Sequence, residues 1–151
     1  MSNLTNMLFS EAVKVHVLNK GTALAVAKYP TSGNFKRIGG KKRFGIMVIV
    51  NAVNSACVLQ VQQATAANGT PKNIDGAVKT IAADGSDDGK WSIIEVDTAK
   101  MDINNGYQYI TVDVTGASGS NDLATILLLE FAGDKIPVTQ VDFDEAVNVV
   151  G

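Results

Sequence analysis

One stretch of the sequence has the spacing of a cation-binding loop. Asp84, Ser86 and Asp88 precede Gly89, and Glu95 is the twelfth residue of the window that begins at Asp84. A calcium loop places oxygen ligands at such alternating positions and ends on a glutamate. The flanking residues, however, have the pattern of β-strands and not of the helices that usually hold this loop. The alternative is a solvated hairpin loop, and on balance we expect neither a metal nor any other cofactor.

Basic side chains gather around Gly39 and Gly40. Five of the thirteen Lys and Arg residues fall within eight positions there: Lys36, Arg37, Lys41, Lys42 and Arg43. Such a cluster can contact nucleic-acid phosphates, dock on an acidic protein surface, or solubilise a turn beside an apolar strand. The chain has a net charge of −2 and no aromatic platform near the cluster beyond Phe35 and Phe44. We therefore expect a docking patch or a solubilising turn, and no direct contact with nucleic acid.

The residue types that serve nucleophilic or zinc chemistry are scarce. The chain has one histidine, His16, and one cysteine, Cys57, so catalytic or zinc arrangements of these types rest on single residues. We expect His16 at a surface or interface and Cys57 as a small buried hydrophobe. Asp97, Asp102 and Asp113 have no spacing that requires them to meet as a carboxylate pair. The sequence thus predicts a protein that is not an enzyme.

The elements that position these residues are β-strands. The strongest segment, 105–116, is rich in β-branched and aromatic residues and is closed by glycine near each end. Ile110, Val112 and Val114 alternate along it with Tyr109, Thr111 and Asp113. Because successive side chains of a strand point to opposite faces, we interpret it as a central strand with one buried face. The segments 43–53 and 55–65 are its expected partners.

Other strands follow from shorter patterns. The continuous apolar run 43–50 predicts a strand buried on both faces, and further strands are expected at 78–82, 91–97 and 123–131. We expect a turn at 19–21 and a long polar connection over 64–76. Strands that recur about every ten residues between turn signals favour an all-β fold, either a β-sandwich or a jelly roll.

The length of 151 residues suits one domain that buries its own core. We divide the chain into an N-terminal arm (1–20), a β-sandwich domain (21–132) and a C-terminal arm (133–151). The first residues lack the basic start and apolar run of a secretory signal, and no apolar stretch approaches the ~20 residues that span a bilayer. We therefore expect synthesis in a cytoplasm and no membrane partner.

Three segments carry a family resemblance. They are Val58-Leu59-Gln60-Val61-Gln62-Gln63-Ala64-Thr65, then Ile94-Glu95-Val96-Asp97, then Gly106-Tyr107-Gln108-Tyr109-Ile110. Together they resemble small structural proteins encoded among the head genes of tailed bacteriophages, some of which are similar to capsid decoration (cement) proteins. The resemblance covers residues 44–131 and leaves out both arms and the basic turn.

The resemblance implies a virion protein on the outside of an icosahedral capsid, bound to the major capsid protein and tying neighbouring capsomers together. It also implies a homotrimer with a sandwich or jelly-roll body. We add the hypothesis that the basic turn (Lys36, Arg37, Lys41, Lys42 and Arg43) and the acidic C-terminal residues (Asp142, Asp144 and Glu145) provide capsid or subunit contacts.

Two other binding functions remain open. A structural protein of the phage tail or of the head–tail junction shares the β architecture. A carbohydrate-binding module requires a row of exposed aromatic side chains, for which Trp91, Tyr107 and Tyr109 are the available set. We expect Trp91 to pack in the core instead, which disfavours the carbohydrate-binding interpretation.

Overall fold

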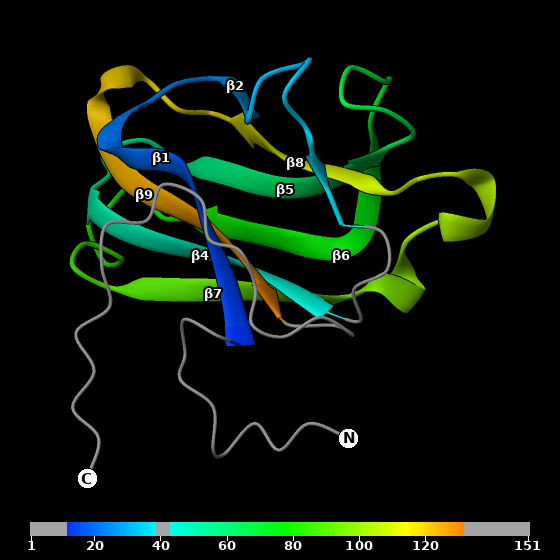
Figure 1. Ribbon diagram of the computed structural model, residues 1–151. Helices are drawn as coiled ribbons and strands as arrows, with labels where there is room; N and C mark the ends of the chain where they lie inside the picture. Colours follow the sequence, from blue (N-terminus) through cyan, green and yellow to red (C-terminus); the bar gives the residue numbers. More distant parts are fainter. Residues whose placement is uncertain (1–11, 39–42, 132–151) are drawn as a thin grey trace, which may run out of the picture.

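The computed structural model describes residues 12–38 and 43–131. They form two antiparallel sheets stacked as the layers of a β-sandwich (Figure 1), so the predicted all-β fold is confirmed. In strand order, sheet I contains β1 (Val13–Leu24), β9 (Gly119–Phe131), β4 (Arg43–Ala52) and β7 (Trp91–Asp97). Sheet II contains β2 (Ala27–Tyr29), β8 (Tyr109–Thr115), β5 (Cys57–Ala64) and β6 (Lys72–Ile81), with β3 (Lys36–Arg37) also paired to β8.

Two short 3-10 helices, η2 (Thr98–Lys100) and η3 (Ile103–Asn105), lie in the connection from β7 to β8. This connection projects from one end of the sandwich in Figure 1. The Asp97 side chain caps η2 by accepting a hydrogen bond from the Ala99 N–H at 2.9 Å. No helix in the described ranges is long and apolar enough to cross a membrane.

The inner faces of the two sheets form the core. On β8, Ile110, Val112 and Val114 are fully buried, which confirms the predicted buried face of this strand. They lie in the same buried cluster as Phe44 and Ile46 of β4, in the opposite sheet. Of the two expected partners of β8, the segment 55–65 pairs with it as β5, whereas 43–53 faces it from the other layer. Apolar patterning marks both as core strands, but it does not say which sheet each one joins.

Two strands extend beyond the predicted limits. β1 runs through the expected turn at 19–21 and absorbs the extra residues as register shifts against β9. There the Asn19 amide donates to the Ala124 carbonyl at 2.7 Å, which replaces part of the strand ladder. Because β1 begins at Val13, residues 13–20 belong to the sandwich and not to an N-terminal arm.

β6 begins at Lys72, inside the segment that we expected to be a polar connection. Its register against β5 shifts between Gln60 and Gln62. The Gln60 amide donates to the carbonyls of Ile74 and Ala77, at 3.0 and 3.1 Å, and so satisfies backbone groups that the shift leaves out of the ladder. The Gln60 side chain therefore holds β6 in place over a stretch whose sequence lacks the apolar alternation of a strand.

Gly116, in the connection from β8 to β9, provides a test of its close approach to the connection from β4 to β5. Its φ is +79°, and a Cβ built on it would lie 2.3 Å from the Ala56 carbonyl oxygen. We expect Gly116→Ala to lower the free energy of unfolding by about 3 kcal/mol, since the left-handed backbone costs ~1–2 kcal/mol and the Ala56 backbone must also move. Urea unfolding measures the loss.

The matched control is Gly76→Ala. Gly76 has almost the same φ, +78°, but no atom lies within 4 Å of the added Cβ. Only the conformational cost of ~1–2 kcal/mol should appear there. Equal losses in the two variants would show that the close approach at Ala56 contributes nothing.

Candidate contact surfaces

The basic turn spans both sheets at the positions that the structure describes. Lys36 and Arg37 form β3 and pair with β8 of sheet II, whereas Arg43 begins β4 of sheet I. Arg37 is exposed and donates to the Gln108 side chain at 3.0 Å, and the exposed Arg43 has its Nε 3.7 Å from Asp97. These three side chains are accordingly available at the surface, with Lys36 half-buried.

Five of the proposed contact residues lie outside the described ranges. They are Lys41 and Lys42 of the basic turn and Asp142, Asp144 and Glu145 near the C-terminus. The hypothesis that they contact a capsid or a neighbouring subunit stays a prediction.

The calcium-like window does not converge on one point. It connects β6 of sheet II to β7 of sheet I, so it is a crossing between the sheets and not a hairpin. Asp84 accepts from the Ser86 N–H at 3.0 Å and Asp88 from the Val53 N–H at 3.0 Å. Hydrogen bonds from Ser86 hold the pKa of Asp84 below its usual value. No group of three His, Cys, Asp or Glu side chains suited to a metal occurs in residues 12–38 and 43–131.

The other candidate acids each pair with a different cation, Asp97 with Arg43. Asp113 of β8 pairs with Lys28 at 3.0 Å, and Asp102 pairs with Lys72 at 2.7 Å. The Lys72 ammonium also lies 4.0 Å from the centre of the Tyr107 ring. The hydrogen bond between Lys72 and Asp102 raises the pKa of the lysine, and this bond, together with one from Asn105, lowers the pKa of the aspartate.

Asp122, at the start of β9, is a structural site that the sequence pattern did not reveal. It is fully buried and accepts hydrogen bonds from the N–H groups of Asn54, Ser55 and Ser118, at 2.8, 3.2 and 2.7 Å, and from the Ser118 hydroxyl at 2.8 Å. Burial alone would raise the pKa of this carboxyl, but these hydrogen bonds to the charged form lower it to about 2. Asp122 thereby ties together the two connections, β4–β5 and β8–β9, that cross between the sheets.

The single histidine and the single cysteine are both internal. His16 of β1, 6% exposed, is hydrogen-bonded through Nε2 to Oε2 of Glu130 on β9, which is 4% exposed. The expected surface position of His16 is therefore wrong, because the carboxylate lets the ring be buried. Cys57 is buried as predicted, and burial, with a smaller effect of the Asp122 charge, raises the pKa of its thiol.

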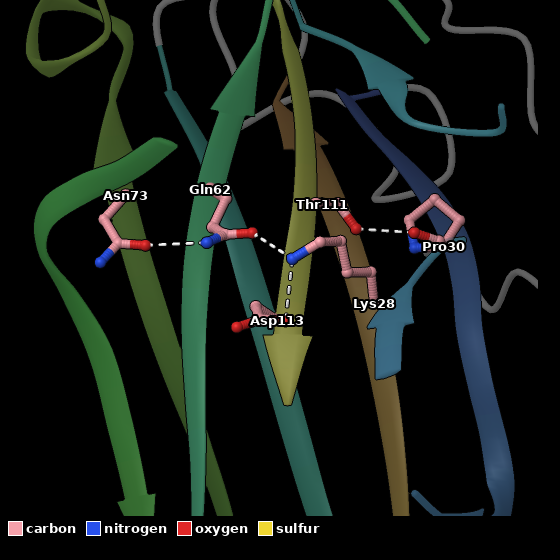
Figure 2. A network of polar contacts seen from close by, with 6 residues as sticks. All are labelled: Lys28, Pro30, Gln62, Asn73, Thr111 and Asp113. Atoms are coloured by element: carbon pink, nitrogen blue, oxygen red, sulfur yellow. Dashed lines mark hydrogen bonds and ion pairs between the residues drawn. The ribbon is translucent and has the colours of Figure 1, made fainter. Parts of the chain in front are cut away.

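The outer face of sheet II is polar (Figure 2). The Lys28 ammonium lies between Asp113 and the Gln62 side chain, and the Gln62 amide in turn donates to Asn73 at 2.9 Å. The Thr111 hydroxyl donates to the Pro30 carbonyl at 2.7 Å. These bonds satisfy the polar side chains of this outer face, where Thr111 is fully buried and Lys28 and Asp113 are half-buried.

The outer face of sheet I is apolar, which the sequence interpretation missed. Trp91, at the start of β7, is 64% exposed, so the prediction that it packs in the core is wrong. It pairs with Ile49 of β4, which is 37% exposed, so the predicted burial of segment 43–50 on both faces is also incomplete. The continuous apolar runs were the available signal: they showed that both faces of these strands are apolar, but not what covers the second face.

The three aromatic residues of the carbohydrate-binding interpretation do not form a row. Trp91 belongs to β7 of sheet I, whereas Tyr109 begins β8 of sheet II. Tyr107 precedes β8 and lies against Lys72. Among the described residues, these three aromatic side chains therefore do not provide the aligned row that carbohydrate binding requires.

An open groove of about 440 Å³ lies beside β6 and β7, the edge strands of the two sheets. Its charged lining includes Arg43 and Lys100 together with Asp75, Glu95 and Asp97. The mixture of signs favours no particular charged ligand.

Comparison with known proteins gives weak likenesses. No family model matches the chain, and no curated protein sequence matches it. Among solved structures, the SPBc2 prophage-derived protein YomS is similar over 80% of this chain and 93% of its own, with 11% identity and a TM-score of 0.46. The CBM22-1–GH10 modules of Clostridium thermocellum endo-1,4-β-D-xylanase 10B match 72% of this chain and 20% of that one, with 14% identity and a TM-score of 0.34. One structurally similar protein is thus prophage-derived.

Proposed function

We propose that this chain is a non-enzymatic structural protein of a tailed-phage particle, which binds the outer surface of the capsid and cross-links neighbouring major capsid proteins. The observation that carries the proposal is that the acidic side chains hydrogen-bond to loop backbone and do not form a catalytic or metal-binding cluster within the described residues. Asp84, Asp88, Asp97 and Asp122 each accept hydrogen bonds from backbone N–H groups of connections between strands. These groups hold the loops of a rigid body, as expected of a protein whose function is to present surface.

The family resemblance supports the same function. Its three motif segments lie in or directly before β5, β7 and β8, so they come from both sheets and build the body itself. On a capsid, a rigid body that makes several modest contacts to repeated sites gains affinity through avidity. The expected partner is accordingly the major capsid protein, and the expected state of the bound protein is a trimer.

The first test is imaging. We expect cryo-electron microscopy of the source phage, or of its empty capsids mixed with the purified full chain, to reveal added density at the threefold positions of the shell. A bare shell with the density at the neck or tail would overturn the decoration function in favour of the head–tail junction alternative.

The basic turn provides a second test. Replacing Lys41, Lys42 and Arg43 together by Ser should weaken capsid binding about tenfold at low salt, since three cations leave a docking surface. Co-sedimentation with empty capsids measures the change. The effect should shrink at high salt, where exposed charges are screened over about 3–10 Å.

The control for net charge is the triple replacement of Lys28, Lys72 and Lys79 by Ser, which removes the same charge from β2 and β6 of sheet II, outside the basic turn. We expect it to bind capsids nearly as well as the wild type. Unchanged occupancy of the basic-turn variant would remove this turn from the contact surface.

A further inference from the structure

The outer surface of sheet I carries a contiguous group of apolar side chains. β4 directs Phe44, Ile46 and Val48 into the core, so the alternate residues Met47 and Ile49 lie on the outer surface. Cross-strand pairing adds neighbours on both sides: Leu127 and Ile93 flank Met47, while Thr125 and Trp91 flank Ile49. Val17 of β1 extends the row of Met47, since it pairs with Leu127. We call Val17, Met47, Ile49, Trp91, Ile93 and Leu127 the outer apolar face.

The charges around this face lie at its edges and not in its centre: Lys20 of β1 pairs with Thr125, at the β1 end of the row that contains Ile49. Arg43 and Asp97 are opposite each other in one cross-strand row, and the Arg43 Nε lies 3.7 Å from an Asp97 carboxylate oxygen, so their charges balance. Glu95 lies opposite Gly45 on the neighbouring strand. The rows that contain Met47 and Ile49 have no charged side chain on β4, β7 or β9. The outer surface of sheet II differs, since Lys28 and Asp113 lie within its hydrogen-bonded network. A partner that covers the outer apolar face must therefore be apolar and uncharged where it meets these rows.

Trp91 is the expected anchor of such a contact. It is 64% exposed at the edge strand of sheet I, and tryptophan is among the residues that contribute most to binding energy at protein interfaces. Its ring combines a large apolar area with few rotatable bonds, so it loses little conformational freedom on binding.

The size of the face indicates what kind of partner it fits. Four strands spaced by ~4.8 Å and two rows spaced by ~7 Å give a patch of roughly 270 Å². A stable pair of proteins usually buries ~800 Å² on each partner, so this face alone is too small to hold two copies of the chain together. It is large enough for one of several contacts to a lattice, where each weak contact is reinforced by the others.

We infer that the outer apolar face, anchored by Trp91, seats the body on an uncharged apolar patch of the capsid surface. This inference rests on the proposed capsid-binding function and adds the surface that makes the contact. It assigns the salt-insensitive part of binding to sheet I, separate from the salt-sensitive contribution expected of the basic turn.

The test compares Trp91→Ala and Ile49→Thr with Val78→Thr in the full chain. Val78 is also an exposed apolar residue, at 46%, but lies on β6 of sheet II. We expect Trp91→Ala to weaken binding to empty capsids at least tenfold and Ile49→Thr severalfold, both equally at low and high salt, with melting temperatures close to that of the wild type. Val78→Thr should bind like the wild type.

Each contrary outcome has its own meaning. If the wild type binds empty capsids and Trp91→Ala binds them with the same affinity, this inference is overturned and the proposed function stays in place. If the wild type does not bind capsids, the proposed function itself is overturned. Sedimentation of a wild-type dimer that Trp91→Ala abolishes would make the face a contact between copies. Trp91 is the only tryptophan, so weak acrylamide quenching of its fluorescence in the free protein would mean that the chain itself covers the face. Either of these last two results would also overturn the inference.

Discussion

Replacing His16 by Leu is expected to lower the free energy of unfolding by about 3–5 kcal/mol, because the change leaves the Glu130 carboxylate buried without its partner. The two side chains extend from adjacent strands of sheet I and are 6% and 4% exposed. Glu130→Met should cost less, about 1–3 kcal/mol, since it leaves a buried imidazole that lacks one hydrogen-bond partner. Urea unfolding of both variants measures these losses.

The double variant is the decisive member of this series. His16→Leu combined with Glu130→Met places two apolar side chains in an apolar layer, and replacing both partners of a buried hydrogen bond by apolar groups is often neutral or stabilising. We expect the double variant to be within about 1 kcal/mol of the wild type, far from the sum of the single losses. Additive losses would mean that each residue acts through its own packing and that the pair has no coupling.

An exposed ion pair serves as the control. Lys28 and Asp113 are 3.0 Å apart, but their side chains are 32% and 26% exposed. Replacing Lys28 by Leu should therefore cost less than about 1 kcal/mol, as is typical of pairs that solvent screens. A loss as large as that of His16→Leu would show that exposure does not separate the two cases.

Asp122→Asn is expected to lower the free energy of unfolding at neutral pH by about 3 kcal/mol. The carboxylate accepts four hydrogen bonds while fully buried, and an amide would turn its NH2 group towards N–H donors. Because Asp122 fastens two crossings between the sheets, we expect the loss to appear as one cooperative transition at lower urea. The measurement is urea unfolding at several pH values.

The pH dependence follows from the direction of the shift. The folded-state pKa of Asp122 is about 2, below the reference value of 3.8. The charged form is therefore favoured by folding, and its contribution of about 2 kcal/mol is present above pH ~4 and is lost as the pH falls towards ~2. The difference between wild type and Asp122→Asn should shrink by that amount over this interval.

Asp75→Asn is the control for this series. Asp75 is exposed on β6, so the change should cost less than about 0.5 kcal/mol and keep the acid response of the wild type. If the difference between wild type and Asp122→Asn stays constant from pH 5 to pH 2, the hydrogen bonds to Asp122 do not stabilise its charged form.

The sequence by itself determined the strands and their inner faces. Ile110, Val112 and Val114 were identified as core residues because alternation with period two is a local property of the chain. The same reasoning predicted the segments 43–53 and 55–65 as neighbours of that strand, of which only 55–65 pairs with it, and an all-β fold that is either a β-sandwich or a jelly roll. The local pattern failed to predict the start of β6, because hydrogen bonds from the Gln60 side chain, and not apolar alternation, hold that part of the strand.

Only the tertiary structure decided which residues meet. His16 and Glu130 are 114 positions apart, and Asp122 reaches Asn54 across 68 positions, so no spacing in the sequence could pair them. Sheet membership is equally non-local: β4 and β5 are consecutive strands, yet they lie in opposite layers. Apolar residues on both faces of β4 predicted double burial, but the pattern of one strand cannot show what covers its second face. The position of Trp91 and Ile49 on an exposed surface therefore follows from the stacking of the two sheets alone, because a sandwich of two layers buries only one face of each sheet.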